Sequence, residues 1–124
     1  MNDDYYIENQ RFLTTSDKTI AVLCHLAPIL GYALFIGHIA IPLIIMLWKG
    51  RESKFLSLNA REALNFQLSL TIYWIVNGIL MLFLVGFIFA AFLIVFQLIV
   101  MINAAIKAGS GSVYRYPLCI RFIK

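Results

Sequence analysis

The sequence predicts an all-α integral membrane protein made of two helical hairpins, with four helical segments of which the second is short. Of its 124 residues, 62% are hydrophobic and only 13% are charged, whereas soluble domains average about 45–50% and about 25%. Two stretches, 19–48 and 63–106, contain no Asp, Glu, Lys or Arg. A helix needs about 20 apolar residues to cross a bilayer. These observations exclude a soluble globule and a disordered chain.

The charged residues predict which side of the membrane each end of the protein faces. They occupy three segments: an N-terminal tail with a net charge of −2, residues 49–62 with +2, and the chain after residue 106 with +4. Because basic loops stay on the cytoplasmic side during insertion, we expect the central segment and the C-terminus to be cytoplasmic. The N-terminus is cytoplasmic as well if the first apolar stretch forms a hairpin. The expected location is the bacterial cytoplasmic (inner) membrane, with several spans. The cations are few and flank apolar segments, so nucleic acid is not an expected partner.

The chain divides into a polar tail (1–17), a transmembrane helical bundle (18–108) and a basic, aromatic interfacial tail (109–124). Oxygen-bearing side chains at 15–17 predict the cap of a first helix over 18–35. Gly37 and Pro42 then favour a break in the helix. Either 19–48 is one kinked span, or it is a hairpin whose second arm covers 38–48. That arm, about 16 Å long, is too short to cross alone, but the hairpin puts every charge on one face, and we favour it.

The second long apolar stretch predicts two antiparallel helices. We expect a polar loop over 49–58, then a helix that begins near residue 59 or 60, capped by Ser57 or Asn59, and leaves the bilayer near Val85. Gly86 marks the turn. The last helix covers 87–107, and the Gly-Ser-Gly run at 109–111 ends it.

The C-terminal tail alternates in character. Aromatic and aliphatic residues occupy even positions from Tyr114 to Phe122, while Arg115 and Arg121 occupy odd ones. Pro117 is incompatible with a regular helix through this segment. We predict an extended segment at the membrane interface, with aromatic side chains inward and arginines toward lipid phosphates or a partner. An unstructured basic tail is the alternative.

Polar side chains within or beside the apolar stretches are the candidates for a site, because such groups are costly in a membrane. Glu62, Asn65 and Ser69 are spaced to share one helix face. The polar groups either line a path for a substrate or form hydrogen bonds between helices. We expect Glu62 to form an ion pair with Arg115 or Arg121. The full set of candidates is Cys24, His25, Arg61, Glu62, Asn65, Gln67, Asn77, Gln97, Asn103, Arg115, Tyr116, Pro117 and Arg121.

The sequence offers little that fits an enzyme. Cys24 and His25 are adjacent, but no third ligand stands within a helical turn of them, and a metal ion needs three or four ligands. We expect His25 to form a hydrogen bond to a neighbouring helix. No nucleophile–base pair, glycine-rich phosphate loop or pair of carboxylates is evident. We therefore expect no enzymatic activity, no metal ion and no cofactor.

Three separated motifs carry a resemblance to a known family: AVLCHL at 21–26, REALNFQ at 61–67, and YRYPL at 114–118 followed by IRF at 120–122. Over 18–124 the chain resembles the DUF4870 family of small bacterial membrane proteins, also described as Tic20-like. The resemblance implies a four-helix membrane bundle and a role in a protein-conducting complex. That family often carries His-Gly where this chain has Asn59-Ala60, so the resemblance assigns no histidine there.

Our main hypothesis is a non-enzymatic interaction or accessory subunit of a membrane complex. Its expected partners are the lipid bilayer and another membrane protein or a second copy of the chain. The alternatives are a homo-oligomeric channel lined by Asn65, Asn77, Gln97 and Asn103, a Tic20-like translocation component, or a lipid-binding role for the basic tail.

Overall fold

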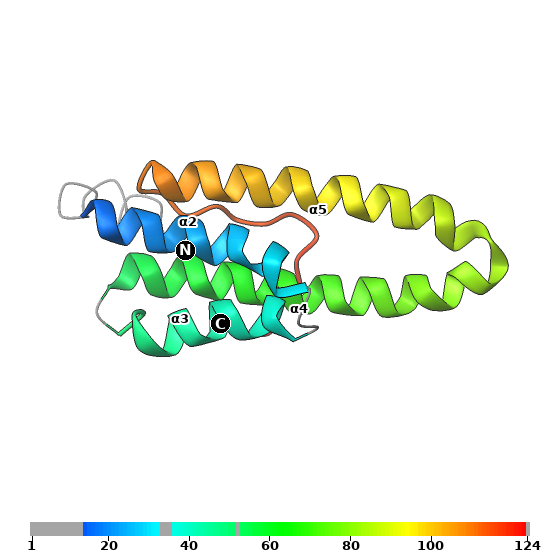
Figure 1. Ribbon diagram of the computed structural model, residues 1–124, viewed down its shortest axis with the longest axis horizontal. Coiled ribbons are helices and arrows are strands. Elements are labelled where there is room, and N and C mark those ends of the chain that lie inside the picture. The colour runs from blue at the N-terminus through cyan, green and yellow to red at the C-terminus, as the bar shows by residue number, and fades with distance from the viewer. Residues whose placement is uncertain (1–13, 33–35, 52, 124) are drawn as a thin grey trace.

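The computed structural model describes residues 14–32, 36–51 and 53–123. These residues form four α-helices and one short 3₁₀ helix, and they contain no β-strand. All four helices run roughly parallel or antiparallel along one axis, and the C-terminal tail lies among them as an extended segment (Figure 1). The all-helical prediction with four helical segments is confirmed.

Helix α2 (Thr15–Gly31) begins three residues earlier than predicted. Thr14 is the N-cap residue: its hydroxyl accepts a hydrogen bond from the Asp17 amide at 3.0 Å, and the Asp17 carboxylate accepts one from the Thr14 amide at 3.4 Å. This reciprocal pair satisfies two amides that the first helical turn leaves free. The helix ends at Gly31, so the predicted end at residue 35 lies among residues that the structure does not describe.

Helix α3 (Gly37–Trp48) returns along α2, which confirms the hairpin and shows that a single kinked span was wrong. Two glycines allow the close approach at the turn. A Cβ on Gly31 would lie 2.4 Å from the carbonyl carbon of Gly37, which is too close for any side chain. Pro42 lies inside α3 without ending it.

Helix α4 (Lys54–Leu80) begins five or six residues before the predicted start, so the expected loop over 49–58 is wrong in its second half. The reason is the cap. Ser53 is extended, and its hydroxyl accepts a hydrogen bond from the Leu56 amide at 3.3 Å. Phe55 and Leu56 in the first turn are also buried in the bundle core, which favours helix there over a polar loop.

A tight turn joins α4 to α5 (Val85–Gly109) through the 3₁₀ helix η3 (Met81–Phe83). The reversal takes place at Leu84, which has a positive φ of 65°, two residues before the predicted turn at Gly86. Gly86 is needed for a different reason: a Cβ there would lie 2.2 Å from the Met81 nitrogen. Helix α5 ends at the Gly-Ser-Gly run, as predicted.

The two hairpins differ in length. Lys54–Phe83 and Val85–Gly109 are each long and apolar enough to cross a membrane, by length and composition. The 12-residue α3 is about 18 Å long and the 27-residue α4 about 40 Å. Helices α2 and α3 therefore cover only the half of the long hairpin that carries its open end (Figure 1).

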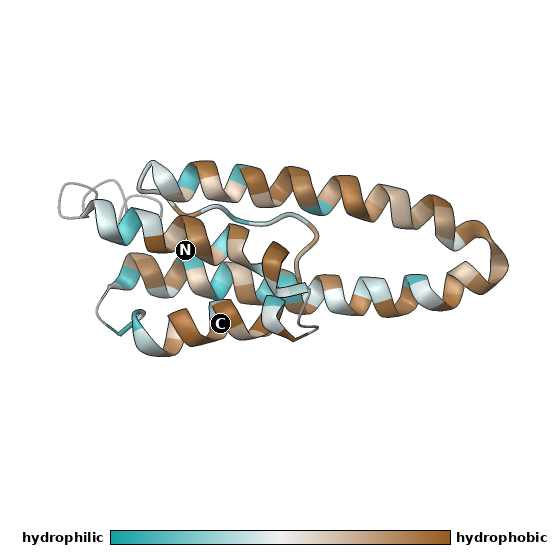
Figure 2. Cartoon of the chain, viewed as in Figure 1, coloured by the Kyte–Doolittle hydropathy of each residue, from teal (hydrophilic) through white to brown (hydrophobic). Residues whose placement is uncertain are grey.

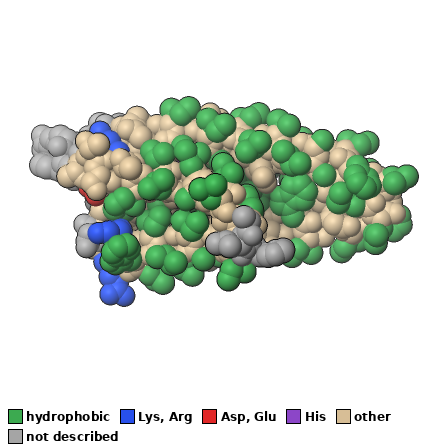
Figure 3. All heavy atoms as spheres, in the orientation of Figure 1, with side chains coloured by type: hydrophobic (Ala, Val, Ile, Leu, Met, Phe, Trp, Pro, Cys, Tyr) green, Lys and Arg blue, Asp and Glu red, His purple; other side chains and the backbone are tan. Residues whose placement is uncertain are grey.

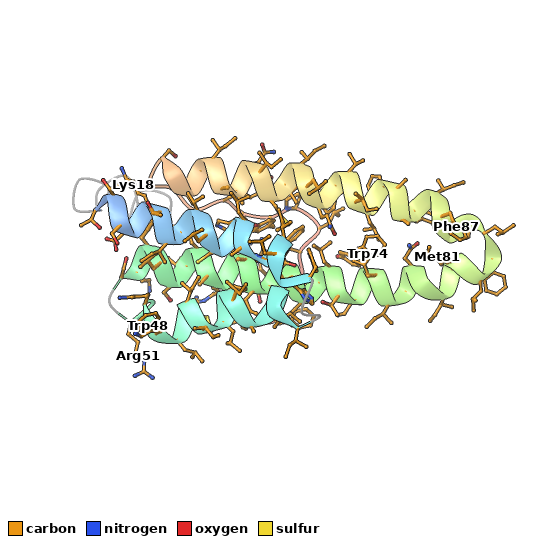
Figure 4. All side chains as sticks on the ribbon, in the orientation of Figure 1. Lys18, Trp48, Arg51, Trp74, Met81 and Phe87 are labelled. Carbon is orange, nitrogen blue, oxygen red and sulfur yellow. The ribbon has the colours of Figure 1, made fainter. Side chains whose placement is uncertain are left out.

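Polarity follows the same division. Lys18 and Arg51 lie at the four-helix end, whereas Met81 and Phe87 lie at the far turn (Figure 4). Apolar residues dominate the outer part of the long hairpin (Figure 2), and lysines and arginines gather at the opposite end of the face seen in Figure 3. Leu82 and Leu84 at the turn are 81% and 75% exposed. Such an apolar surface is suited to contact with lipid rather than water.

Candidate functional site

The four-helix half encloses a buried polar network that holds the C-terminal tail. The predicted helix face of α4 supplies three of its residues. Asn65 donates from Nδ2 to the Ile123 carbonyl at 2.9 Å and accepts from the Ile123 amide at 2.8 Å. Ser69 accepts from the Ile120 amide at 2.8 Å. Glu62 accepts from the Tyr116 amide at 3.3 Å. This face binds the tail: its side chains supply hydrogen bonds that a neighbouring strand would give to an extended segment.

Tyr116 anchors the tail in the bundle. Its side chain is 2% exposed, and its ring stacks on Phe66 at a centroid distance of 4.1 Å and an interplanar angle of 12°. Its hydroxyl lies 2.6 Å from His25 Nδ1. Burial, and then the nearby Glu62 carboxylate, raise the pKa of the Tyr116 phenol well above its usual value. The hydroxyl therefore stays protonated and can donate to the imidazole.

His25 connects the tail to two helices, and the contacts define its tautomer. Its Nε2 lies 2.9 Å from Asn59 Oδ1. The Asn59 amide is oriented by a second bond, from Nδ2 to the Phe55 carbonyl at 3.0 Å. Because Asn59 Oδ1 only accepts, Nε2 carries the proton in the neutral ring and Nδ1 accepts from Tyr116. The expected hydrogen bond from His25 to a neighbouring helix is confirmed.

Glu62 forms an ion pair with Arg121, one of its two predicted partners. Arg121 Nη1 lies 3.3 Å from Glu62 Oε2. Nη2 of the same guanidinium donates to the Tyr116 carbonyl at 3.1 Å. One carboxylate thus receives both a backbone amide and a cation from the tail, at the point where Tyr116 enters the core. Charge-assisted bonds of this kind are stronger than neutral ones.

The predicted alternation of the tail holds only before Pro117. Tyr116 is buried, but Leu118 and Phe122 are 66% and 48% exposed, so the expectation that all even positions point inward is wrong. A turn at Pro117 and Leu118, where Leu118 has a φ of 53°, interrupts the extended backbone. Beyond it, an odd-numbered side chain, Arg121, points to Glu62. The tail is extended and ordered, so the alternative of an unstructured tail is wrong.

The remaining candidates are dispersed. Cys24 is buried against Ala60 and Ala63, and Asn103 is exposed. Gln97 accepts from the Trp74 indole at 3.0 Å, across the long hairpin.

Two amides on α4 have contrasting surroundings. Gln67 accepts a hydrogen bond from the Tyr32 hydroxyl at 2.7 Å. Its amide nitrogen, Nε2, lies 3.7 Å from the Met101 sulfur. Asn77 is 2% exposed and lines an apolar cavity of about 470 Å³. Neither polar atom of its amide has a hydrogen-bond partner among the described residues. Asn77 is thus set apart from the network that holds the tail.

Sequence reasoning missed the part played by Asn59, which was considered only as a helix cap. It also missed the Tyr73 hydroxyl, which donates to the Leu118 carbonyl at 2.5 Å. The local signal was an asparagine two residues before Arg61, on the same helix as Glu62, Asn65 and Ser69. Its partner His25 is 34 residues away, so spacing along one helix could not reveal the contact.

We predict that Asn65→Ala loosens the tail without unfolding the bundle. The substitution removes both hydrogen bonds to Ile123 and leaves partly buried backbone groups unpaired, which costs at most about 1–3 kcal/mol. Limited trypsin digestion in detergent should then cut faster at the tail arginines. Asn103→Ala, the same change at an exposed position of α5, is the control. Equal cleavage rates in both variants would contradict the assigned role of Asn65.

The fold and the network define a class of protein: a small helical protein with two helices long and apolar enough to cross a membrane, whose polar side chains pack its own C-terminal tail against a four-helix core. A family model for the magnetosome magnetite crystal formation proteins, MamF and MmsF, matches residues 16–123. The chain belongs to this family. No curated protein and no solved structure matches it.

The family match corrects the earlier resemblance. The chain is not a DUF4870 or Tic20-like protein, and a role in protein translocation loses its support. The motifs that carried the resemblance are residues that hold the fold together: His25 in the first, Glu62 and Asn65 in the second, and Tyr116 and Arg121 in the third. These residues are shared features of how the tail packs, and they do not identify the function of the protein.

Proposed function

We propose that this protein is a non-enzymatic, multi-pass membrane protein that takes part in magnetite crystal formation as an accessory or interaction subunit of a membrane assembly. The observation that carries the proposal is the family match, which covers nearly the whole chain, including the helices and the tail. The geometry supports a scaffold. His25, Asn59, Glu62 and Asn65 engage one another or the tail, so surfaces, rather than these groups, remain for contact with partners.

We further propose a membrane placement. The α4–α5 hairpin crosses the bilayer, with its charged end and both termini in the cytoplasm, in accord with the excess of Lys and Arg at that end. The shorter α2–α3 hairpin enters from the same side and turns within the hydrocarbon region. The membrane is the cytoplasmic (inner) membrane of a bacterium. The length of α3 supports this placement, since about 18 Å is well short of a bilayer core of about 30 Å.

Cysteine labelling tests this placement. In a Cys119→Ser background, which keeps the buried Cys24 and is labelled alongside as the blank, one added cysteine replaces Ser110, Phe83 or Ile36, each of which is exposed. A thiol reagent that cannot cross membranes should label position 110 only from the cytoplasmic side and position 83 only from the opposite side. Position 36 should resist it from both sides and react only after detergent is added. Labelling of position 36 in intact cells would show that the short hairpin crosses completely.

The role itself is tested in a magnetite-forming host. Deletion of the gene should change the size or number of crystals seen by electron microscopy, and the wild-type chain should restore them. Gly78→Ala is the control for an innocuous substitution: position 78 is exposed and nothing lies within 4 Å of the added Cβ, so this variant should restore the crystals as the wild-type chain does. Unchanged crystals in the deletion strain, with the protein shown to be present in the parent, would refute the proposal.

Co-purification separates the accessory role from the alternative, a homo-oligomeric channel. The tagged protein, expressed near its native level and extracted gently, should carry a stoichiometric foreign subunit if it is accessory. A particle that contains only copies of this chain would favour the channel and would call for flux measurements in vesicles.

A further inference from the structure

A second feature lies beside the contacts that hold the tail and shares some of their residues. A cavity of about 320 Å³ lies between α4 and the C-terminal tail. Its charged lining consists of Glu62 and three arginines, Arg61, Arg115 and Arg121. Three cations and one anion leave an excess of two positive charges around the cavity. Its volume is at the lower end of the range for small-ligand pockets, which begins at about 300 Å³.

The arginines are not equally committed to the fold. Arg121 donates from Nη2 to the Tyr116 carbonyl, and its Nη1 forms the ion pair with Glu62 without a hydrogen-bond partner among the described residues. Arg61 Nε is likewise buried and has no hydrogen-bond partner among the described residues. Arg115 is exposed on the tail. A buried guanidinium nitrogen without a partner is costly. The Arg61 side chain lines the cavity, so a phosphate there would add acceptors beside a guanidinium that the described residues leave partly unpaired.

The position of the cavity bears on which acceptor can reach it. Residues 62–83 extend for about 30 Å along the long hairpin at 1.5 Å per residue, which matches the thickness of a hydrocarbon core. With the hairpin upright in a bilayer, Arg61 and Glu62 lie at the edge of that core on the charged side. This is the depth at which lipid phosphates lie.

We propose that this cavity binds a phosphate group. Arginine presents a planar fork of donors that matches phosphate oxygens in pairs, and it is favoured wherever phosphate is recognised. Arg61 and Arg115 provide the binding donors, and Glu62 holds Arg121 in place beside them. The phosphate is carried either by a membrane phospholipid or by free inorganic phosphate. The assignment does not rest on a role in crystal formation.

Thermal unfolding of the full chain in an uncharged detergent tests the site. One arm adds short-chain phosphatidylglycerol, with diacylglycerol of the same chain length as the comparison that lacks phosphate. The other arm adds inorganic phosphate. We expect a saturable rise in the unfolding midpoint in at least one arm, and none with diacylglycerol. A rise only with phosphatidylglycerol assigns the phosphate to lipid, and a rise with inorganic phosphate assigns the free ion.

Substitutions tie the effect to the cavity. Arg61→Gln and Arg115→Gln should each weaken the apparent affinity about tenfold. Arg51→Gln, which removes the same charge from an exposed loop at the same end of the protein, should leave it unchanged. An equal loss in Arg51→Gln would show that only net charge matters and would overturn the proposal, as would the absence of any rise in both arms. If Arg61→Gln does not fold, the exposed Arg115→Gln decides.

Discussion

Tyr116→Ala is expected to lower the free energy of unfolding by about 3–5 kcal/mol, the range for removing a large buried aromatic side chain. The Tyr116 ring is stacked on Phe66 and is 2% exposed, so its loss opens a cavity at the centre of the four-helix half. The change also removes the Tyr116 hydroxyl, which lies 2.6 Å from His25 Nδ1. The unfolding midpoint in detergent, read by circular dichroism, measures the effect.

Two further variants separate the ring from the hydroxyl. Tyr116→Phe keeps the stacking and should cost about 1–3 kcal/mol, the penalty for a buried group left unpaired. Phe122→Ala removes an aromatic ring from a half-exposed position of the same tail and should cost much less than Tyr116→Ala. If Phe122→Ala and Tyr116→Ala lower the midpoint equally, Tyr116 is not the anchor of the tail.

Gly31→Ala is expected to separate α2 from α3 at their turn. The added Cβ would lie 2.4 Å from the Gly37 carbonyl carbon and 2.5 Å from the His38 nitrogen. These are backbone atoms and cannot move aside as a side chain can, so the two helices must shift. Overpacking of this kind costs about 1–3 kcal/mol and sometimes more. A lower unfolding midpoint and faster proteolysis near residues 31–37 are the expected results.

Gly78→Ala provides the matched control. It is the same substitution on a helix, but nothing lies within 4 Å of the new Cβ. Because glycine costs about 0.5–1 kcal/mol relative to alanine inside a helix, this variant should be as stable as wild type or slightly more stable. A loss of stability in Gly78→Ala as large as that in Gly31→Ala would mean that the close contact between Gly31 and Gly37 is not the cause of the destabilisation.

The helices and their pairing could be predicted because they depend on patterns that are local in sequence. Two charge-free stretches defined the hairpins, and Gly37 marked the first turn. The spacing of Glu62, Asn65 and Ser69 correctly placed them on one face. What that face binds could not be derived, because spacing reveals a direction but not the occupant. Its occupant is the tail, 51 to 58 residues further along the chain.

The errors at element ends have a common cause. The start of α4 depends on Ser53 adopting an extended backbone and on Phe55 and Leu56 reaching a core made by other helices. The alternation of the tail fails at Leu118, which has a positive φ that a leucine does not lead one to expect. In both cases tertiary packing outweighed local preference, and a single sequence carries no direct record of that packing.

The unequal lengths of the two hairpins have a consequence for the surrounding lipid. With the long hairpin upright in a bilayer, one leaflet contains α2, α3, the tail and the open ends of α4 and α5, whereas the other contains only two helices and their turn (Figure 1). In the placement proposed above, the protein would be wedge-shaped in cross-section. It would displace more lipid from the leaflet at its charged end than from the opposite one, and many copies side by side would bend the membrane in which they lie.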